Sequence, residues 1–395
     1  MPWEVPEGWC WTTIGDCLIN RDGERIPISS EIRIKQKNKV FDYYGAAGVI
    51  DKVDDYLFNE RLLLIGEDGA NLLSRAKDNA FFAEGKYWVN NHAHILDATR
   101  KPLLDYIALY INSIALDPYI TGSAQPKLNQ DNLNRIPVPL PPFMEQLRII
   151  DSMAKSQVII DIIAEKQKEI VNAISLAKSK ILDLAIHGKL VPQDPSDEPA
   201  IELLKRINPD FVPSDNLHYE GDLPNGWCFS TIGDLFKHNT GKALNGRERN
   251  GEDQRYITTS NLYWDRFDLK EVRTMPFTEA EKEKCRATKG DLLVCEGGDV
   301  GRAAIWPYDF DIMIQNHIHR LRPKEDFSVR FFYYIFLLYK QTGLIGGKGI
   351  AILGLSSREL DRMVVPVPPV PEQHRIVSII EKLFAQMDSL SINLS

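Results

Sequence analysis

An internal repeat constrains the fold of this chain more than any other feature of its sequence. Residues 6–16, which contain Gly8 and Trp9, return as residues 224–234 with Gly226 and Trp227. Four further blocks follow in the same order: 63–69 match 292–298, 91–94 match 316–319, 104–107 match 332–335, and 135–149 match 362–376. Five blocks repeated in one order indicate a tandem duplication, and a chain of 395 residues is long enough for two or more domains.

Each copy begins with a globular part of about 140 residues, in the size range of an ordinary domain. Short runs typical of strands (62–65, 86–89, 291–294 and 312–314) alternate with turns rich in Gly and Asp. A helix is expected near 102–113 and again near 329–339. The proline-rich segments 139–142 and 366–369 then end the globular part, because proline fits neither a helix interior nor a central strand. The predicted fold class is therefore α/β (α+β).

A heptad pattern replaces the strand pattern after each proline-rich segment. Apolar residues step alternately by four and three, which keeps one stripe facing a partner helix along the whole length. The first predicted helix runs from Glu145 to His187 and spans roughly 60 Å, at 1.5 Å per residue. Gly188 is expected to cap its end. The predicted coiled-coil core is Ile149, Met153, Ile160, Ile163, Ile170, Ile174, Ile181 and Leu184 in the first helix, and Ile376, Ile380, Leu383, Met387 and Leu390 in the second.

These patterns divide the chain into five predicted parts. They are a first globular domain at 1–143, a heptad helix at 144–190, an acidic linker at 191–222 with a short helix near 200–207, a second globular domain at 223–370 and a shorter heptad helix at 371–395. The linker holds eight acidic and two basic residues, so most of the net charge of −8 lies there. The overall negative charge therefore does not exclude DNA binding.

The order of these motifs is similar to that of type I restriction-modification specificity subunits. The resemblance covers essentially the whole chain: two copies led by Gly-Trp, each ending in Pro-x-Pro-Pro-x-x-Glu-Gln and a heptad helix, and the helix end at 181–192. It implies two tandem target recognition domains joined by an antiparallel coiled coil of long helices. Each domain would read one half of a split, asymmetric DNA site. The coil would fix the gap between the half-sites.

The resemblance also implies partners. Two modification (methyltransferase) subunits that bind S-adenosylmethionine would dock on the coil, and restriction (translocase and nuclease) subunits that use ATP and Mg would join them. The chain itself would bind double-stranded DNA, hold no cofactor or metal, and act in the bacterial or archaeal cytoplasm. The pattern departs from the family at its end: the second heptad helix is short and the ending like 188–190 is absent. We expect a free stripe from Ile170 to Leu184 to favour self-association.

DNA affinity comes mostly from phosphate contacts by Lys and Arg, while amide side chains read base edges. The candidates in the first copy are Arg21, Arg25, Arg33, Lys35, Lys37, Asn38, Lys39, Asn71, Arg75, Lys86, Gln125 and Lys127. Those in the second copy are Lys242, Asn245, Arg247, Arg249, Arg255, Asn261, Arg266, Arg273, Arg302 and Lys348. Residues 21–39 have no counterpart at 237–255, as expected if the two copies read different sequences.

Some motifs of the sequence also allow a metal-binding or catalytic interpretation. The Asn-His-x-His blocks suit a metal site by spacing, but no third ligand recurs with them, so structural histidines are favoured. Trp9 and Trp227 are expected to be core anchors. Pro141-Pro142-Phe143 is similar to part of an adenine methyltransferase tetrad, but Leu140 stands where that tetrad has Asn. No phosphate-binding loop is present. A non-catalytic chain is therefore expected.

Two alternatives to the family function stay open: a stand-alone DNA-binding or decoy module, and an enzyme of unknown type on a duplicated scaffold. The start of the chain has no basic and apolar segments of a signal peptide. The longest apolar run is too short to cross a membrane. The five cysteines form no Cys-x-x-Cys pair, and reduced thiols are expected.

Overall fold

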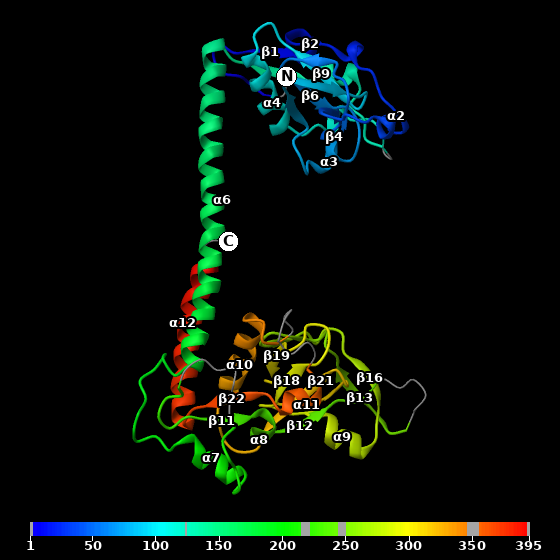
Figure 1. The fold of residues 1–395 in the computed structure, drawn as a ribbon. Helices are drawn as coiled ribbons and strands as arrows, with labels where there is room; N and C mark the ends of the chain where they lie inside the picture. Colours follow the sequence, from blue (N-terminus) through cyan, green and yellow to red (C-terminus); the bar gives the residue numbers. More distant parts are fainter. Residues whose placement is uncertain (1–2, 123–124, 215–221, 244–249, 346–354, 393–395) are drawn as a thin grey trace. The chain divides into compact units, whose positions relative to one another are not determined.

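A computed structural model describes residues 3–122, 125–214, 222–243, 250–345 and 355–392. It divides into two compact units, Met1–Ala164 and Glu165–Ser395, and each is described by itself (Figure 1).

The first unit contains two four-stranded sheets. One has the order β2-β9-β6-β7, with bounds Ile19–Asn20, Ala93–Asp97, Leu62–Gly66 and Ala80–Ala83, and its neighbours are all antiparallel. The other has the order β4-β3-β8-β5, with bounds Gly48–Val53, Phe41–Gly45, Lys86–Val89 and Phe58–Asn59, and β3 runs parallel to β8. The short helices are α1 (Ile14–Cys17), α2 (Ser30–Lys35), α3 (Asn71–Ser74) and α5 (Gln130–Asn134), with 3-10 turns at Asp22–Glu24 and Asp117–Tyr119.

The second unit repeats this topology. Its sheet β12-β21-β18-β19 has bounds Phe236–Thr240, Ile318–Pro323, Leu292–Cys295 and Ala303–Ile305. Its sheet β16-β13-β20-β17 has bounds Arg273–Phe277, Glu252–Ile257, Ile312–Ile314 and Arg286–Ala287, again with one parallel pair, β13 and β20. The duplication expected from the sequence is therefore a duplication of structure. Helices α8 (Ile232–Leu235) and α11 (Ser357–Asp361) match α1 and α5 of the first unit.

The two copies differ in their insertions. The first copy carries α2 between β2 and β3, and α3 between β6 and β7. The second instead carries a small hairpin, β14 (Leu262–Tyr263) with β15 (Arg266–Phe267), and helix α9 (Glu279–Cys285) between β16 and β17. A common frame thus supports different surface segments.

The core of each unit lies between a buried strand and one helix. All five residues of β6 are buried, and α4 (Pro102–Ser113) packs its apolar face in the same cluster. In the second unit β18 and α10 (Val329–Gln341) take these places. The helices predicted near 102–113 and 329–339 are thus confirmed. The apolar spacing of three and four residues buries one helix face because it matches the helical period.

The proline-rich segments form strands that close each globular part. β1 (Cys10–Thr13) pairs antiparallel with β10 (Pro137–Leu140), and β11 (Cys228–Thr231) pairs in the same way with β22 (Val364–Val367). In a two-stranded sheet every strand is an edge, so the prolines cost no central ladder bond. The start and end of each copy are thereby held together, directly before a long helix begins.

The two heptad segments form long helices. α6 (Phe143–Ile186) is one helix of 44 residues, and α12 (Val370–Ile392) has 23. Within the second unit they run antiparallel: Lys178 Nζ bonds to Asp388 Oδ1, while Ile181 and Ala185 share a buried cluster with Ile376 and Ile380. Gly188 has a φ of +63° and caps α6, as the sequence predicts. No described helix is long and apolar enough to cross a membrane.

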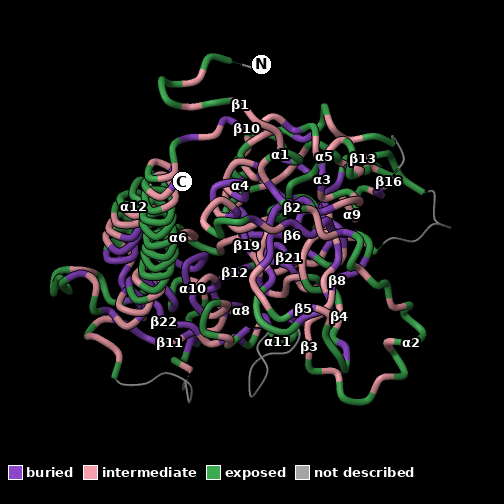
Figure 2. The backbone as a smooth tube through the Cα atoms, turned by 90° about the horizontal axis from the view of Figure 1, so that it is seen from above, coloured by how far each residue is buried: buried purple, intermediate pink, exposed green. Residues whose placement is uncertain are grey.

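Burial changes sharply along α6. Met153, Ile160 and Ile163 are about half exposed, and Figure 2 shows α6 exposed over most of its length. Only the last residues of the helix, from about Ile181, lie in the core of the second unit. Of the predicted coil core, Ile376 and Ile380 are fully buried, Leu383 and Met387 are half-buried, and Leu390 is exposed. Helix α7 (Ala200–Ile207), predicted within the linker, buries Leu203 and Leu204 in that same core.

Candidate nucleic-acid interface

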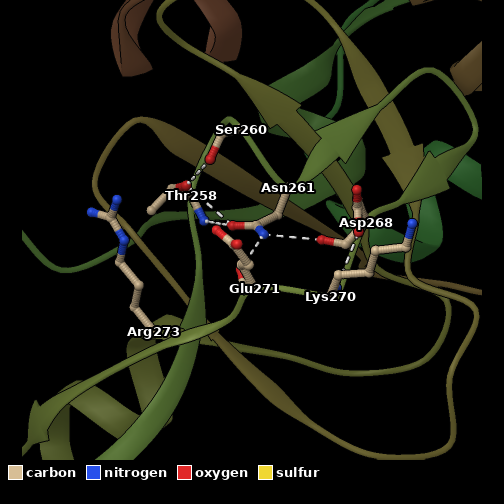
Figure 3. Close-up of a pocket in the computed structure, with 7 residues that line it drawn as sticks. All are labelled: Thr258, Ser260, Asn261, Asp268, Lys270, Glu271 and Arg273. Atoms are coloured by element: carbon tan, nitrogen blue, oxygen red, sulfur yellow. Dashed lines mark hydrogen bonds between the residues drawn. The ribbon is translucent and has the colours of Figure 1, made fainter.

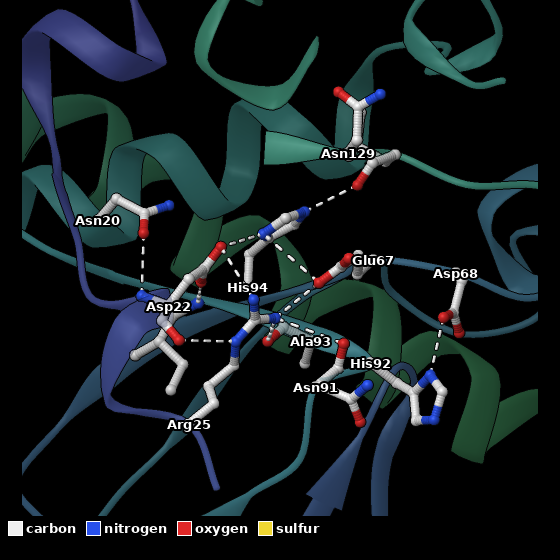
Figure 4. A network of polar contacts seen from close by, with 12 residues as sticks. Asn20, Asp22, Arg25, Glu67, Asp68, Asn91, His92, Ala93, His94 and Asn129 are labelled. Carbon is white, nitrogen blue, oxygen red and sulfur yellow. Dashed lines mark hydrogen bonds and ion pairs between the residues drawn. The ribbon is translucent and has the colours of Figure 1, made fainter. Parts of the chain in front are cut away.

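A buried histidine ties together four segments of the first unit (Figure 4). The His94 side chain is 1% exposed; its Nδ1 lies 2.5 Å from Asp22 Oδ2, and its Nε2 lies 2.7 Å from the Leu128 carbonyl oxygen. When Asp22 is ionised, its carboxylate and the Leu128 carbonyl oxygen are both hydrogen-bond acceptors for the ring. Burial raises the pKa of Asp22, but the hydrogen bond and charge of His94 outweigh it and hold that pKa below its ordinary value.

Arg25 and Glu67 extend this cluster. Arg25 donates to Glu67 Oε2 at 2.6 Å and to the Ala93 carbonyl at 2.9 Å. Lys127 reaches the other Glu67 oxygen at 3.1 Å. The turn after β2, the end of β6, the start of β9 and the segment ending at Leu128 are thus held by charge-assisted bonds, which are stronger than neutral ones.

The second unit has a related but different cluster. His319, the counterpart of His94, brings Nε2 to the Leu355 carbonyl oxygen at 2.6 Å, and Leu355 is the counterpart of Leu128. Its Nδ1 lies 2.9 Å from His238 Nε2, and His238 Nδ1 lies 2.7 Å from Asp361 Oδ1. Burial lowers the pKa of His319 to about 4, so this ring is neutral at pH 7. In both copies the shared histidine therefore clamps a backbone carbonyl.

The contacts in these clusters argue against a metal site at the Asn-His-x-His blocks. His94 and His319 point into the protein and their ring nitrogens are already engaged. Among the described residues, no group of three or more His, Cys, Asp or Glu side chains is arranged to hold a metal ion. Burial also raises the pKa of the Cys17 and Cys295 thiols to about 11, which makes them poor ligands and nucleophiles.

Several predicted DNA contacts of the first copy are bound within the protein. Arg21 pairs with Glu24 and Glu60, and Arg33 and Lys39 share Asp51. Asn71 bonds to Asn79 and to the backbone of Lys77, and Arg75 bonds to the carbonyl of Asn112. In each case the charged group or amide that would contact DNA is already bonded to another group of the protein. Arg25 and Lys127 are engaged in the His94 cluster, as described above.

The remaining candidates of the first copy are exposed. Lys35, Lys37, Asn38 and Gln125 make no ion pair or side-chain hydrogen bond with the part of the chain that is described. Lys86 is exposed and lies over the Tyr56 ring at 4.6 Å. Lys35 is the last residue of α2 and Lys37 follows it, and α2 has no counterpart among the described residues of the second copy.

The candidates of the second copy also divide into residues bound within the protein and exposed residues. Lys242 is nearly buried and pairs with Glu281, and Arg302 bonds to the Thr259 carbonyl. Arg255 and Arg273 are exposed and form no ion pair with any described residue, and Arg266 stacks over Tyr263 at 4.3 Å. Asn245, Arg247, Arg249 and Lys348 lie outside the described residues.

A hollow of about 290 Å³ opens beside Asn261 in the second unit (Figure 3). Asn261 itself is 8% exposed: its Oδ1 accepts from the Thr258 backbone N–H, and its Nδ2 donates to the carbonyls of Asp268 and Glu271. Figure 3 shows Arg273 and Lys270 on opposite sides of this amide. Asn261 thus shapes the hollow while the cations at its rim face outward.

The Glu-Gln pair of each repeat joins the long helix to its globular part. Trp227 donates to Glu372 at 2.9 Å, and Trp9 donates to Glu145 at 3.2 Å. The following glutamine caps the proline-rich segment: Gln373 Nε2 donates to the Pro368 carbonyl at 2.9 Å, and Gln146 Nε2 makes the matching bond to Pro141. Trp227 is buried, as predicted for a core anchor, whereas Trp9 is half-buried.

A family model described as the type I restriction modification DNA specificity domain matches this chain twice, at residues 6–172 and 224–393. The chain belongs to this family. A putative type I restriction enzyme specificity subunit from Haemophilus influenzae is 24% identical, over 96% of this chain and 89% of its own. The EcoEI specificity subunit of Escherichia coli is 22% identical, over 100% and 80%.

Solved structures support the fold of this specificity subunit. The HsdS subunit of Thermoanaerobacter tengcongensis superposes with a TM-score of 0.60 at 15% identity, covering 100% of this chain and 93% of that one. A chain from a structural study of complex assembly and conformational transition of the type I restriction-modification system gives 0.61 at 16% identity, covering 100% and 94%. The chain is therefore a DNA specificity subunit, a non-catalytic subunit of its enzyme.

Sequence reasoning missed the partners of the shared histidines and the amide before each Asn-His-x-His block. Asn90 and its counterpart Gln315 are both buried, and each accepts from the backbone N–H two residues later. The repeat alignment places both directly before a shared block, which was the available signal.

Proposed function

We propose that the two copies of this specificity subunit read the two halves of a bipartite, asymmetric DNA target. One observation carries this proposal: the copies share a sheet topology, yet differ in the segments inserted into it, α2 and α3 in one and β14, β15 and α9 in the other. A shared frame holds each reader, and different insertions give different sequence preferences.

Phosphate contacts should come from the exposed cations that form no ion pair with a described residue. We assign this role to Lys35, Lys37 and Lys86 in the first copy, and to Arg255, Arg266 and Arg273 in the second. Ion-paired residues such as Arg21 and Arg33 are better suited to hold the fold, because a carboxylate already neutralises them. Each phosphate contact should contribute about one unit to the salt dependence of binding.

We further propose that two methyltransferase subunits dock on α6 and that restriction subunits join through them. The segment 157–164 supports this, since Val158, Ile159, Ile160, Ile162 and Ile163 are all more than half exposed and span roughly 200° of the helix at 3.6 residues per turn, with Gln157 and Asp161 on the remaining side. An apolar helix face is normally covered, and a single partner helix on the side of Ile160 and Ile163 would leave Val158 and Ile162 uncovered. In that assembly S-adenosylmethionine, ATP and Mg would act on the partner subunits, in the cytoplasm.

The stripe expected to be free, from Ile170 to Leu184, is partly covered instead, because Ile181 shares a buried cluster with Ile376 and Ile380 of α12. The exposed residues at 158–163 support self-association of the chain when methyltransferase subunits are absent. Light scattering of the purified chain at micromolar concentration should show a dimer or larger species that dissociates when methyltransferase subunits are added. A strict monomer would contradict this part of the proposal without affecting DNA reading.

A domain exchange tests the reading function. Residues 10–130 are replaced by those of another specificity subunit, and cells that express the hybrid with methyltransferase subunits are analysed by methylome sequencing. One half of the methylated target should change while the other half and the gap stay the same. If both halves change together, the proposed division between the copies is wrong.

A further inference from the structure

An open hollow of about 500 Å³ lies at one edge of the second sheet of the first unit. It is bounded by the start of α2, by strands β3 and β4, and by the turn after β8. The lining residues are Pro27, Ile28, Ser29, Ser30, Arg33, Tyr43, Ile50, Asn90, Asn91 and His92. The hollow thus has an apolar wall, with Pro27, Ile28 and Ile50, and a polar side formed by the turn at 90–92.

Asn90 is the unusual residue of this hollow. It is only 4% exposed, and its Oδ1 accepts from the His92 backbone N–H at 2.8 Å. Its Nδ2 has no hydrogen-bond acceptor among the described residues, although it belongs to a buried side chain that lines the hollow. Nδ2 is not one of the fully buried atoms that lack a partner, so it reaches the solvent of the hollow, where a ligand acceptor could take the place of water.

The charge of the hollow indicates what kind of partner fits. Arg33 is its arginine, but the guanidinium pairs with Asp51 at 2.9 Å and lies over the Tyr43 ring at 4.5 Å. His92 is bound to Asp68 at 2.7 Å. A phosphate would need a free cation, whereas a base edge needs amide and hydroxyl groups beside an apolar surface.

We propose that Asn90 reads a base edge in the half-site recognised by the first unit. Its two Nδ2 protons would donate to a base acceptor, and the second lone pair of Oδ1 would be open to a base amino group, the combination that suits adenine. This inference rests on the proposed function and adds a specificity residue to it.

The second copy provides a natural comparison. Gln315, the counterpart of Asn90, also accepts through Oε1 from the backbone N–H of His317, but its Nε2 donates to the Asn316 side chain. Its donor is therefore used inside the protein. One hollow of that copy lies between residues 258 and 273, and because the donor of Gln315 is used, we expect base reading at this position in the first unit.

Asn90→Asp tests the proposal with little change in shape. The carboxylate still accepts from the His92 N–H, but the donor is replaced by an acceptor. The chain assembled with methyltransferase subunits is titrated with its target duplex and with duplexes changed at single base pairs. We expect Asn90→Asp to lose about 5- to 150-fold of the preference at one base pair of one half-site, from a typical 1–3 kcal/mol per bidentate contact. Gln315→Glu should leave every preference unchanged.

Ratios between duplexes separate the outcomes. Equal weakening on all duplexes would indicate a phosphate contact or a general charge effect, and unchanged ratios would indicate a structural amide; either result overturns the proposal. A wild-type chain without a bipartite target would instead overturn the proposed function itself. If Asn90→Asp does not fold, Ser30→Trp fills the exposed rim without touching the turn, and it must alter preferences in the same half-site for the proposal to stand.

Discussion

The first prediction compares two histidines that lie two residues apart in the first unit. His94 and His92 each contact an aspartate, at 2.5 and 2.7 Å, but the His94 side chain is 1% exposed and that of His92 is 48% exposed. Their geometry is therefore alike and their environments are opposite. Replacing each by alanine should separate the contribution of burial from that of the contact itself.

The expected cost of His94→Ala follows from its two bonds. The bond to the Asp22 carboxylate is charge-assisted and worth about 1.5–3 kcal/mol, and the bond to the Leu128 carbonyl about 0.5–1.5 kcal/mol. Removing one member of a buried pair leaves the other charge uncompensated, which places the total near 3–4 kcal/mol. The exposed His92 pair is screened by water, so His92→Ala should cost less than about 1 kcal/mol.

Hydrogen exchange of the full chain measures this difference. The free energy of opening should fall in peptides covering β9 and residues 125–133 of His94→Ala, while peptides of the second unit stay at wild-type protection and serve as an internal control. The two variants should differ by about two orders of magnitude in opening constant, since 1.4 kcal/mol corresponds to a factor of ten. Equal protection in His94→Ala and His92→Ala would refute the claim that the buried cluster stabilises this unit.

Three further predictions follow from single contacts. The pKa of Asp22 is lower in the folded than in the unfolded state, so its stabilisation of the folded state is present above its unfolded pKa and is lost as pH falls through the folded pKa. Asp22→Asn lacks this stabilisation. Its first unit should therefore unfold at a higher pH than wild type on acidification, as followed by tryptophan fluorescence. Gln373→Ala removes two hydrogen bonds of a fully buried side chain and should destabilise the second unit by about 1–3 kcal/mol in hydrogen exchange. Gln146→Ala removes one hydrogen bond and an Oε1 that has no partner among the described residues, so it should cost the first unit less. Gly188→Ala would place a Cβ 2.3 Å from Pro224 at a φ of +63° and should lower the thermal midpoint more than Gly85→Ala, which has a φ of +74° but open space and should cost only about 1–2 kcal/mol.

The sequence predicts the frame of this molecule well, because the frame depends on periodic and repeated patterns. The duplication, the helix at 102–113, the two heptad helices and the cap at Gly188 each follow from local spacing or from self-similarity. Such features require no knowledge of which distant residues meet.

The pairing of individual charges could not be predicted in this way. Whether Arg21 faces DNA or the protein depends on Glu60, which is 39 residues away, between β5 and β6. Asp22 reaches His94 across 72 residues, and the corresponding role in the second copy is taken by His238 and Asp361 from different elements. Since these partners do not follow the repeat, aligning the two copies gives no signal for them.

This difference explains how one frame can carry two readers. In both copies the shared histidine binds a backbone carbonyl, that of Leu128 or Leu355, and a carbonyl is supplied by any residue. The clamp therefore places no demand on the side chains of the segment that precedes it, while it fixes where that segment ends. The groups that hold the histidine have changed between the copies, yet the clamped position has not. The segments inserted between the strands can thus vary in sequence without moving the sheets that support them. If these segments read DNA as proposed, a change in DNA specificity needs no change in the core.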